Sequence, residues 1–372
     1  MYLNYEFLLN LSLLLFIMIF GLIIPKLTLK TIQFGVRIPS SKIDDPRISK
    51  IRNGYTLDVL LYSVPVIVIF AILFNRPLIA TAIVTLEIGV YFVAYLKAHY
   101  KLLKIEREED WYADVNQASY ATISDHVSPV HVLLMFTPMI FIAIIATIIG
   151  IEVYPTLPHI IAIHFGSNGK PNGFATKTYL SVLTTPIIGY VIAAIFLSIG
   201  FLTTKSKIDI ESYAPKASYR TQVMFRNRTI ELLAFIGILT ELLLLFTSLL
   251  TWGIISMGPG FVIIIVAFPV MILLVVAIFS LRYGQMGSRK LDVMRTGEET
   301  FQSLESNRDD NKEWKAGIIY DNKEDNSILV PKRFGIGYTI NIGNKKGVVI
   351  FILLIIGIPL VVVLIIILMA MR

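Results

Sequence analysis

The chain has 372 residues, of which 55% are hydrophobic and 16% carry a charge, with a formal net charge of +7. This composition excludes an ordinary soluble domain and predicts a polytopic membrane protein. The absence of cysteine excludes disulfides, thiolate metal ligands and a cysteine nucleophile. The basic residues lie in loops beside apolar segments, so we assign them to membrane orientation and contact with anionic lipids, and not to nucleic acid.

Eight apolar runs are each long enough to cross a bilayer, which takes about 20 residues in a helix. They cover residues 7–24, 57–74, 78–96, 130–151, 179–202, 229–252, 261–281 and 347–369. The gaps after the first, third, fifth and seventh runs hold 29 of the 33 Lys and Arg residues. Because basic residues beside a span stay in the cytoplasm, we predict an all-α integral membrane protein with eight transmembrane helices and both termini outside.

The longest cytoplasmic loop, residues 282–346, predicts a flexible connector followed by a small β element. Two β-prone runs, 316–320 and 327–330, flank a turn-rich segment and predict a hairpin, and 338–342 predicts a third strand. The loop over 203–228 reads as a short polar connector. We therefore expect a seven-helix bundle over 1–281, a connector over 282–313, a cytoplasmic β element over 314–346 and the eighth helix over 347–372.

The outer loop over residues 152–177 is rich in Pro, Gly and Asn, which excludes a simple helix, yet it contains the apolar stretch HIIAIHF. It predicts an ordered loop that is re-entrant or packed on the surface. His159 and His164, with Glu152 nearby, are weak candidates for a zinc site. The alternative, which we favour, is that both histidines serve loop packing and that no metal binds.

Two carboxylates, Glu87 and Glu241, lie near the middle of apolar runs. An ionisable residue inside a membrane is a functional candidate because its burial is costly unless it is protonated or bonded. One interpretation is a proton-linked or cation-binding pair. The other is that each is a neutral acid bonded to a hydroxyl such as that of Thr85, Tyr91 or Thr240.

No motif supports catalysis. The lone G-x-G at Gly335 and Gly337 and the later GNKKG lack the Ser or Thr of a phosphate loop, and no nucleophile elbow occurs. We therefore predict a non-enzymatic protein without a cofactor. Gly337 is expected to permit a tight turn, while Lys332 and Arg333 are expected to meet lipid headgroups or an acidic partner.

The outer loop resembles the signature of a bacterial membrane domain of unknown function, Y-P-x-L-P, then I-x-x-H-F, then G-x-P-N-G and a Lys. The matching residues are Tyr154, Pro155, Leu157, Pro158, His164, Phe165, Gly169, Pro171, Gly173 and Lys177. One departure is Ala162, where that domain usually has proline.

Two inner segments are similar to motifs that accompany this domain in Gram-positive bacteria. One is FGVRIP at residues 34–39, and the other is W-x-x-G-x-x-Y-x-N with V-P-K-R-F-G-x-G-Y-T-x-N. The second comprises Trp314, Gly317, Tyr320, Asn322, Val330, Pro331, Lys332, Arg333, Gly335, Gly337, Thr339 and Asn341.

The family that these motifs resemble includes the sporulation-delaying-toxin immunity proteins, which protect a producer from its own secreted peptide toxin. The resemblance implies a multi-pass protein of the cell membrane that binds or neutralises a secreted antimicrobial peptide through the outer loop or the bundle. A cytoplasmic regulator would be a second partner beside the membrane lipids. The alternative is a proton-coupled transporter or exporter that uses Glu87 and Glu241, although the lack of an internal repeat argues against it.

Overall fold

The computed structural model describes residues 5–74, 76–113, 116–117, 127–166, 170–211, 213–256, 259–294, 306–307, 309–357 and 360. The chain forms two compact units, which are described separately. The first comprises Met1–Asp125, Lys205–Arg228 and Leu273–Val348, and the second His126–Thr204, Thr229–Ile272 and Val349–Arg372.

Seven helices in the described part of the chain are long and apolar enough to cross a membrane, so the chain is a multi-pass membrane protein. They correspond to the first seven predicted runs. Their bounds are α1 Tyr5–Ile23, α2 Pro46–Leu73, α3 Pro77–Glu108, α4 Pro129–Val153, α5 Tyr179–Thr204, α6 Pro215–Thr251 and α7 Pro259–Tyr283.

The eighth predicted run begins in α10 (Lys345–Ile352) and a π-helical turn, Leu353–Gly357. Except for residue 360, the remainder lies outside the described residues. The prediction of an eighth span therefore stays a prediction.

The two longest of these helices extend well beyond what a membrane requires. α3 has 32 residues and α6 has 37, which correspond to about 48 Å and 56 Å at 1.5 Å per residue, against a hydrocarbon core of about 30 Å. The interpretation of 203–228 as a simple connector is therefore wrong, because its second half is the first part of α6. The helices also continue through Pro65, Pro138 and Pro186.

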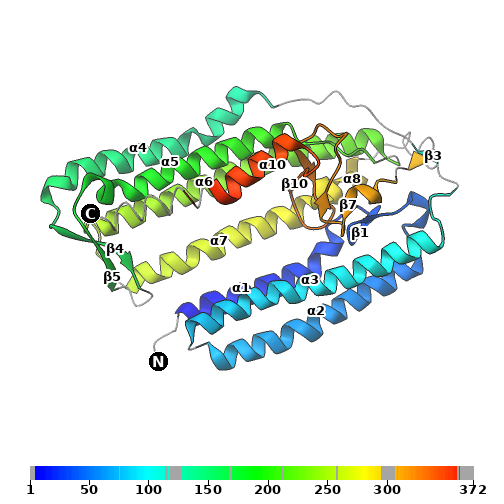
Figure 1. Cartoon of the computed structure of the whole chain (residues 1–372), viewed down its shortest axis with the longest axis horizontal. Helices are drawn as coiled ribbons and strands as arrows, with labels where there is room; N and C mark the ends of the chain where they lie inside the picture. The colour runs from blue at the N-terminus through cyan, green and yellow to red at the C-terminus, as the bar shows by residue number, and fades with distance from the viewer. Residues whose placement is uncertain are drawn as a thin grey trace. The chain divides into compact units, whose positions relative to one another are not determined.

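In the first unit, α1, α2 and α3 lie side by side (Figure 1). Leu14 of α1 packs with Phe70 of α2 and Ala80 of α3 in one buried cluster. The outer side of α2 exposes apolar residues at three- and four-residue spacing, which is the pattern of a lipid-facing stripe. These are Leu57, Leu61, Val64, Val68 and Ile72.

In the second unit, α4 and α5 pack against each other and against the part of α6 that belongs to this unit. Phe136 and Met139 of α4 are buried with Ala193 of α5. Gly200 lies against the Phe136 ring, and Gly237 lies against the Met139 sulfur. Small residues at these contacts allow the helices to approach closely, as is usual in membrane bundles.

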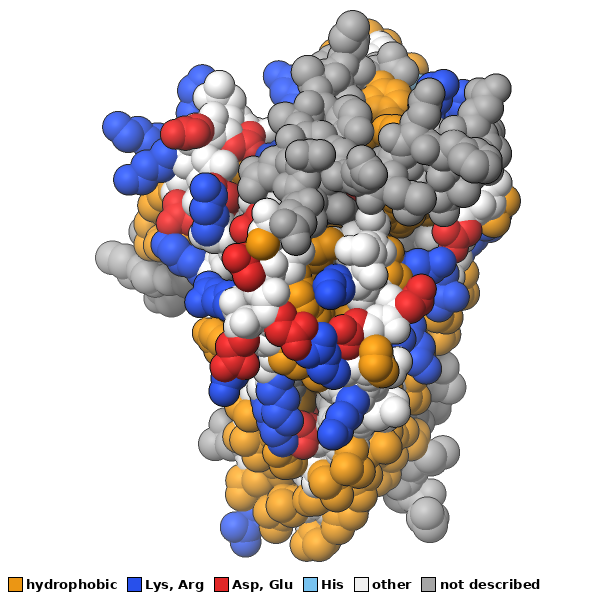
Figure 2. All heavy atoms as spheres, turned by 90° about the vertical axis from the view of Figure 1, so that its right-hand side faces the viewer, with side chains coloured by type: hydrophobic (Ala, Val, Ile, Leu, Met, Phe, Trp, Pro, Cys, Tyr) orange, Lys and Arg blue, Asp and Glu red, His pale blue; other side chains and the backbone are white. Residues whose placement is uncertain are grey.

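The remaining elements of the first unit are short. β1 (Ile32–Gln33) pairs with β2 (Val36–Arg37), β7 (Trp314–Lys315) with β8 (Ile319–Tyr320), and β9 (Leu329–Pro331) with β10 (Tyr338–Ile340), all antiparallel. β3 (Asn116–Gln117) pairs in parallel with β6 (Ser306–Asn307). The helix α8 (Ser288–Met294) follows α7. Figure 2 shows acidic and basic side chains gathered at the end of this unit where β1, β7 and the last turn of α3 lie.

The predicted pairing of 316–320 with 327–330 is wrong. The run 316–320 instead supplies β8, which pairs with β7 because Ala316 and Gly317 adopt positive φ angles of 51° and 66° and close a tight turn after β7. The run 327–330 supplies most of β9, which pairs with a later strand. The expected third strand is present as β10, and it pairs with β9. A parallel bridge between Tyr320 and Asn341 joins the two hairpins.

Candidate functional site

The signature segment over residues 152–177 forms an antiparallel hairpin of β4 (Ile160–Phe165) and β5 (Pro171–Thr176) in the second unit. The pairing is irregular on either side of His164. Gly169, the loop residue of the signature, lies outside the described residues. The apolar stretch is thus a strand, which follows α4 after a short 3-10 turn at Tyr154–Thr156.

The base of the hairpin is closed by Lys177 and two tyrosines. The Lys177 ammonium donates a hydrogen bond of 2.7 Å to the Leu157 carbonyl and lies 5.3 Å from the centre of the Tyr154 ring. That ring stacks on Tyr179 with centroids 3.9 Å apart. The Lys177 backbone N–H also donates to the His159 carbonyl. The signature therefore places its first and last residues in contact, which fixes how the hairpin leaves the helices.

The opposite end of the hairpin depends on a cross-strand pair. His164 and Gly173 face each other, and a Cβ on Gly173 would lie 2.7 Å from the His164 Cβ. The His164 Nδ1 is hydrogen-bonded to the Asn172 side-chain oxygen. Glycine at 173 is therefore required by close approach.

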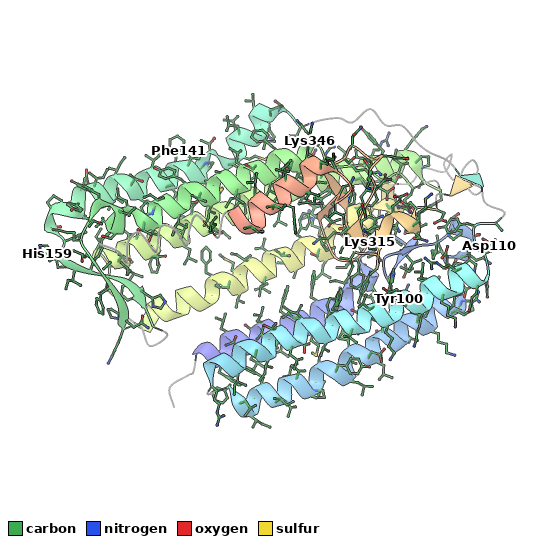
Figure 3. All side chains as sticks on the ribbon, viewed as in Figure 1. Tyr100, Asp110, Phe141, His159, Lys315 and Lys346 are labelled. Atoms are coloured by element: carbon green, nitrogen blue, oxygen red, sulfur yellow. The ribbon has the colours of Figure 1, made fainter. Side chains whose placement is uncertain are left out.

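His159 is exposed at the start of the hairpin (Figure 3). Within the described residues, no group of three or more His, Asp and Glu side chains could hold a metal ion.

The hairpin has a buried side and an exposed apolar side. Ile161 and Leu157 are buried against Trp252, whose indole N–H donates to the Val182 carbonyl at 3.1 Å. By contrast, Ile160 is 64% exposed and Phe174 is 60% exposed. Signature residues Pro155, Pro158 and Pro171 are exposed, and Phe165 is half-buried.

In the first unit, three carboxylates converge on the buried guanidinium of Arg37. Arg37 donates to Glu211 at 2.9 Å, to Asp310 at 3.0 Å and to Asp209. Burial acts to lower the pKa of Arg37, but the carboxylates raise it well above its usual value, so the residue stays charged. Gln222 of α6 fixes Asp209 by accepting its backbone N–H at 2.7 Å. We call Arg37, Asp209, Glu211, Asp310 and Arg333 the ion cluster.

Arg333 is the second cation of the ion cluster. It is 1% exposed, pairs with Asp310, donates to the Asn311 side chain at 2.8 Å and lies 4.9 Å from the centre of the Trp314 ring. The expectation that Arg333 meets headgroups is therefore wrong, and the acidic partner expected as the alternative is Asp310 of the same chain. Lys332 beside it is half-buried, and burial lowers the pKa of its ammonium.

Two tight turns meet back to back beside the ion cluster. Phe34 and Gly35 join β1 to β2 with φ angles of 47° and 76°, and the turn after β7 has the same handedness. A Cβ on Gly35 would lie 2.8 Å from the Gly317 Cα. The Tyr95 hydroxyl of α3 donates to the Ala316 carbonyl at 2.8 Å. The glycines of FGVRIP and of W-x-x-G thus serve one contact between segments far apart in the sequence.

The turn between β9 and β10 is held by Gln285, which follows α7. Its side-chain amide donates to the carbonyls of Lys332 and Gly337 at 2.8 and 2.9 Å, and its oxygen accepts from the Gly337 N–H at 2.8 Å. Gly335 and Gly337 have φ angles of 89° and 97°. A Cβ on Gly337 would meet nothing within 4 Å, so this glycine is needed for its backbone conformation and not for space.

Side chains of the W-x-x-G-x-x-Y-x-N motif and of Asn341 join the β7–β8 and β9–β10 hairpins. The Asn341 amide donates to the Asn322 carbonyl at 2.8 Å and its oxygen accepts from the Asn322 N–H at 3.1 Å. The Tyr320 hydroxyl donates to Asp325 at 2.9 Å, and Lys207 binds the same carboxylate. Asn322 and Tyr320 therefore have a structural role, because they hydrogen-bond to partners within the chain.

Glu87 belongs to the first unit and is fully buried in α3. Within the described residues neither carboxyl oxygen has a hydrogen-bond partner, and the same is true of the Tyr91 hydroxyl. The Ser63 hydroxyl of α2 faces Glu87 without reaching hydrogen-bonding geometry. The expected hydroxyl partner of Glu87 is thus not found in this part of the chain.

Glu241 belongs to the second unit and is buried in α6. Its neighbour Thr240 donates to the Ile236 carbonyl at 2.9 Å and so does not serve the acid. A Cβ on Gly189 of α5 would lie 2.7 Å from the Glu241 Oε2. The glycine therefore lets the carboxyl approach the backbone of α5.

Sequence reasoning missed the acidic half of the ion cluster, namely Asp209, Glu211 and Asp310. Arg37 lies within the FGVRIP motif, so the sequence did mark the segment that carries the cation of the ion cluster. The two acids over 209–211 lie in a segment interpreted as a connector, so the sequence offered no comparable signal for them.

Two segments of the chain match families without an assigned role. Residues 141–189, which contain the signature hairpin, match a domain of unknown function (DUF1648). Residues 323–348, which contain β9 and β10, match a family of unknown function (DUF5808). No curated protein and no solved structure matches the chain.

Proposed function

We propose that this chain is a non-enzymatic membrane protein of the toxin-immunity type, and that it binds a secreted antimicrobial peptide on the exposed side of the β4–β5 hairpin. The observation that supports this is the apolar surface on that hairpin. Ile160 and Phe174 are exposed, while Ile161 and Leu157 hold the hairpin on its other side.

The chemistry of such a surface suits an amphipathic peptide. A two-stranded hairpin also leaves strand edges with free backbone groups, and an extended peptide can pair with an exposed edge while its side chains take apolar contacts. The anchoring of Lys177 on the Leu157 carbonyl keeps this surface in one position, which lowers the ordering cost of binding.

The topology that accompanies this proposal has eight spans, both termini outside, the hairpin outside and the 314–346 element in the cytoplasm. It rests on the alternation of basic loops and on the seven helices of sufficient length and apolarity. Reporter fusions at Arg76 and Lys170 should report outside, and fusions at Lys42 and Lys312 should report inside. An inside signal from Lys170 would refute the toxin-facing hairpin.

The function is tested by expressing the chain in a sensitive host and exposing the cells to secreted antimicrobial peptides, including the product of any small secreted-peptide gene that neighbours its own. Expression should raise survival. Phe174→Ala should lower survival because it removes exposed apolar area, and Gly173→Val should do so because it forces β5 away from His164. Membrane abundance is checked by immunoblot.

Phe141→Ala is the matched control. Phe141 is 59% exposed, is in the same unit and undergoes the same chemical change, but it lies on the membrane helix α4 (Figure 3). Survival should be unchanged in this variant. Equal loss in both variants, or protection that persists without residues 156–172, would contradict a role for the hairpin.

A second candidate is a proton-coupled transporter, which the burial of Glu87 and Glu241 favours. A carrier must change the protonation of at least one of these acids during its cycle, so Glu87→Gln or Glu241→Gln should abolish activity. An immunity protein can keep both acids neutral, and glutamine preserves most of their shape and hydrogen bonding. Under our first proposal, protection should therefore persist in both variants.

A further inference from the structure

A groove of about 280 Å³ runs between α2 and α3 in the first unit. Its α2 side follows one helix face, through Arg47, Lys50, Gly54 and Asp58 at three- and four-residue spacing. Its α3 side includes Lys101. The two faces are brought together by the packing of these helices along their length.

The charges along this groove are unevenly paired. At one end Lys97 and Asp58 bind each other at 2.7 Å, and at the other Arg47 is bound by Asp45 and Glu109. Lys50 and Lys101 lie between these pairs and have no ion-pair partner within the described residues. Two uncompensated ammonium groups therefore face one space.

The pattern of charged and apolar residues on both helices puts the groove near the boundary between headgroups and hydrocarbon. On α2 the last charged residue is Asp58, the second residue of the apolar run that begins at 57, and on α3 the basic residues begin at Lys97, directly after the run that ends at 96. Apolar side chains take part in the lining, including Ile51 and Ile105. On both helices the next turns into the hydrocarbon expose apolar groups, among them Leu57, Leu61 and Val93.

We propose that this groove binds one anionic phospholipid, with the headgroup phosphate between Lys50 and Lys101 and an acyl chain along the apolar residues of α2 and α3. Each part of the groove corresponds to a part of that ligand. The two free ammonium groups match one phosphate, and Gly54 leaves room for it, because a Cβ there would meet nothing within 4 Å. A free phosphate would use the cations but would leave the apolar lining without a partner.

The test is native mass spectrometry of the purified full chain in mixed micelles that contain phosphatidylglycerol or phosphatidylcholine of the same chain length. Phosphatidylglycerol should bind more tightly. Each lysine near an anionic headgroup contributes about a fivefold change in affinity, so Lys50→Ala with Lys101→Ala should weaken phosphatidylglycerol binding about 25-fold. Gly54→Leu should also weaken it while both cations remain.

Two variants are matched controls. Lys104→Ala removes an exposed lysine of α3 whose Nζ lies 3.5 Å from the Glu108 Oε1. Gly89→Leu adds a side chain to open space elsewhere on α3. Neither should change lipid binding, and thermal unfolding midpoints check that all variants fold.

Phosphatidylglycerol binding that is retained within twofold in the double lysine variant would overturn the proposal. So would equal binding of phosphatidylcholine. Displacement of the lipid by millimolar inorganic phosphate would instead show a free-anion site and would equally overturn it.

Discussion

Replacing Arg37 with methionine should destabilise the first unit more than the loss of any surface charge. Methionine keeps part of the apolar stem but removes the guanidinium that meets Asp209, Glu211 and Asp310. All three carboxylates have low exposure, so water cannot replace the lost cation. Arg333 remains ion-paired with Asp310, but the ion pairs that Arg37 makes with Asp209 and Glu211 are lost.

The size of the effect follows from burial. Breaking a buried ion pair by removing one partner costs roughly 3–5 kcal/mol, because an uncompensated charge remains in the interior. The Lys30–Asp292 ion pair in the same unit serves as the exposed comparison. Its Nζ and Oδ2 atoms are 2.9 Å apart, and its side chains are 60% and 59% exposed. A pair of that kind contributes about 0–1 kcal/mol. Arg37→Met should therefore raise the fraction of molecules in which the first unit is locally unfolded by roughly two to four powers of ten. Lys30→Met should hardly change that fraction.

Hydrogen exchange of the amides of β9 and β10 in detergent micelles measures this directly, because Arg333 links the β9–β10 segment to the ion cluster. Exchange there should accelerate in Arg37→Met and stay near wild type in Lys30→Met. Adding Asp209→Asn to Arg37→Met should recover part of the loss, since it removes one uncompensated carboxylate. An exchange rate in Arg37→Met that equals that of Lys30→Met would refute the reasoning.

Three further changes test other contacts. Gly35→Ala should lower the free energy of unfolding by about 2–4 kcal/mol, because it adds a clash to an unfavourable positive φ. Gly337→Ala meets open space and should lower it by only about 1 kcal/mol. Thermal unfolding of both variants measures the difference. Burial acts to raise the pKa of Asp325 and to lower that of Lys207, but their mutual bond holds the acid below and the amine above its usual value. The stabilisation that this ion pair gives should thus be complete between about pH 4 and pH 10. It should be lost as pH falls through the lowered pKa of Asp325 or rises through the raised pKa of Lys207. Asp325→Asn should remove both the acidic and the basic decline from a plot of stability against pH. Lys177→Met should make the β4–β5 hairpin more sensitive to added protease, because the side-chain bond to the Leu157 carbonyl at its base is then lost.

The membrane helices could be predicted from sequence because their signal is local. A span is recognised from about 20 consecutive residues, and a basic loop from the residues beside it. The extension of α6 back to Pro215 was not predicted, since charged and polar residues fill its first turns. A helix outside the hydrocarbon carries no hydropathy signal, so its start is set by tertiary contacts such as that of Gln222 with Asp209.

The inner strands show a similar limit. Their positions were partly predicted from β-prone residues, but their pairing was not. The turn at Ala316–Gly317 requires two consecutive positive φ angles, and alanine gives no sign of that preference. The positive φ of Ala316 accompanies the packing of Gly317 on Gly35, a residue almost three hundred positions earlier.

Arg333 shows why the buried part of the site escaped prediction. An arginine in a basic loop beside a membrane is normally exposed, and the rule that charged residues avoid the interior favours that interpretation. The rule fails only where enough carboxylates converge to replace water, and here they come from positions separated from Arg37 by 172, 174 and 273 residues. No pattern along the chain reports such a convergence. The motif residues around Arg37 and Arg333 are thus explained by the ion cluster that they build, whereas on β4 and β5 the apolar side chains of Ile160 and Phe174 remain exposed.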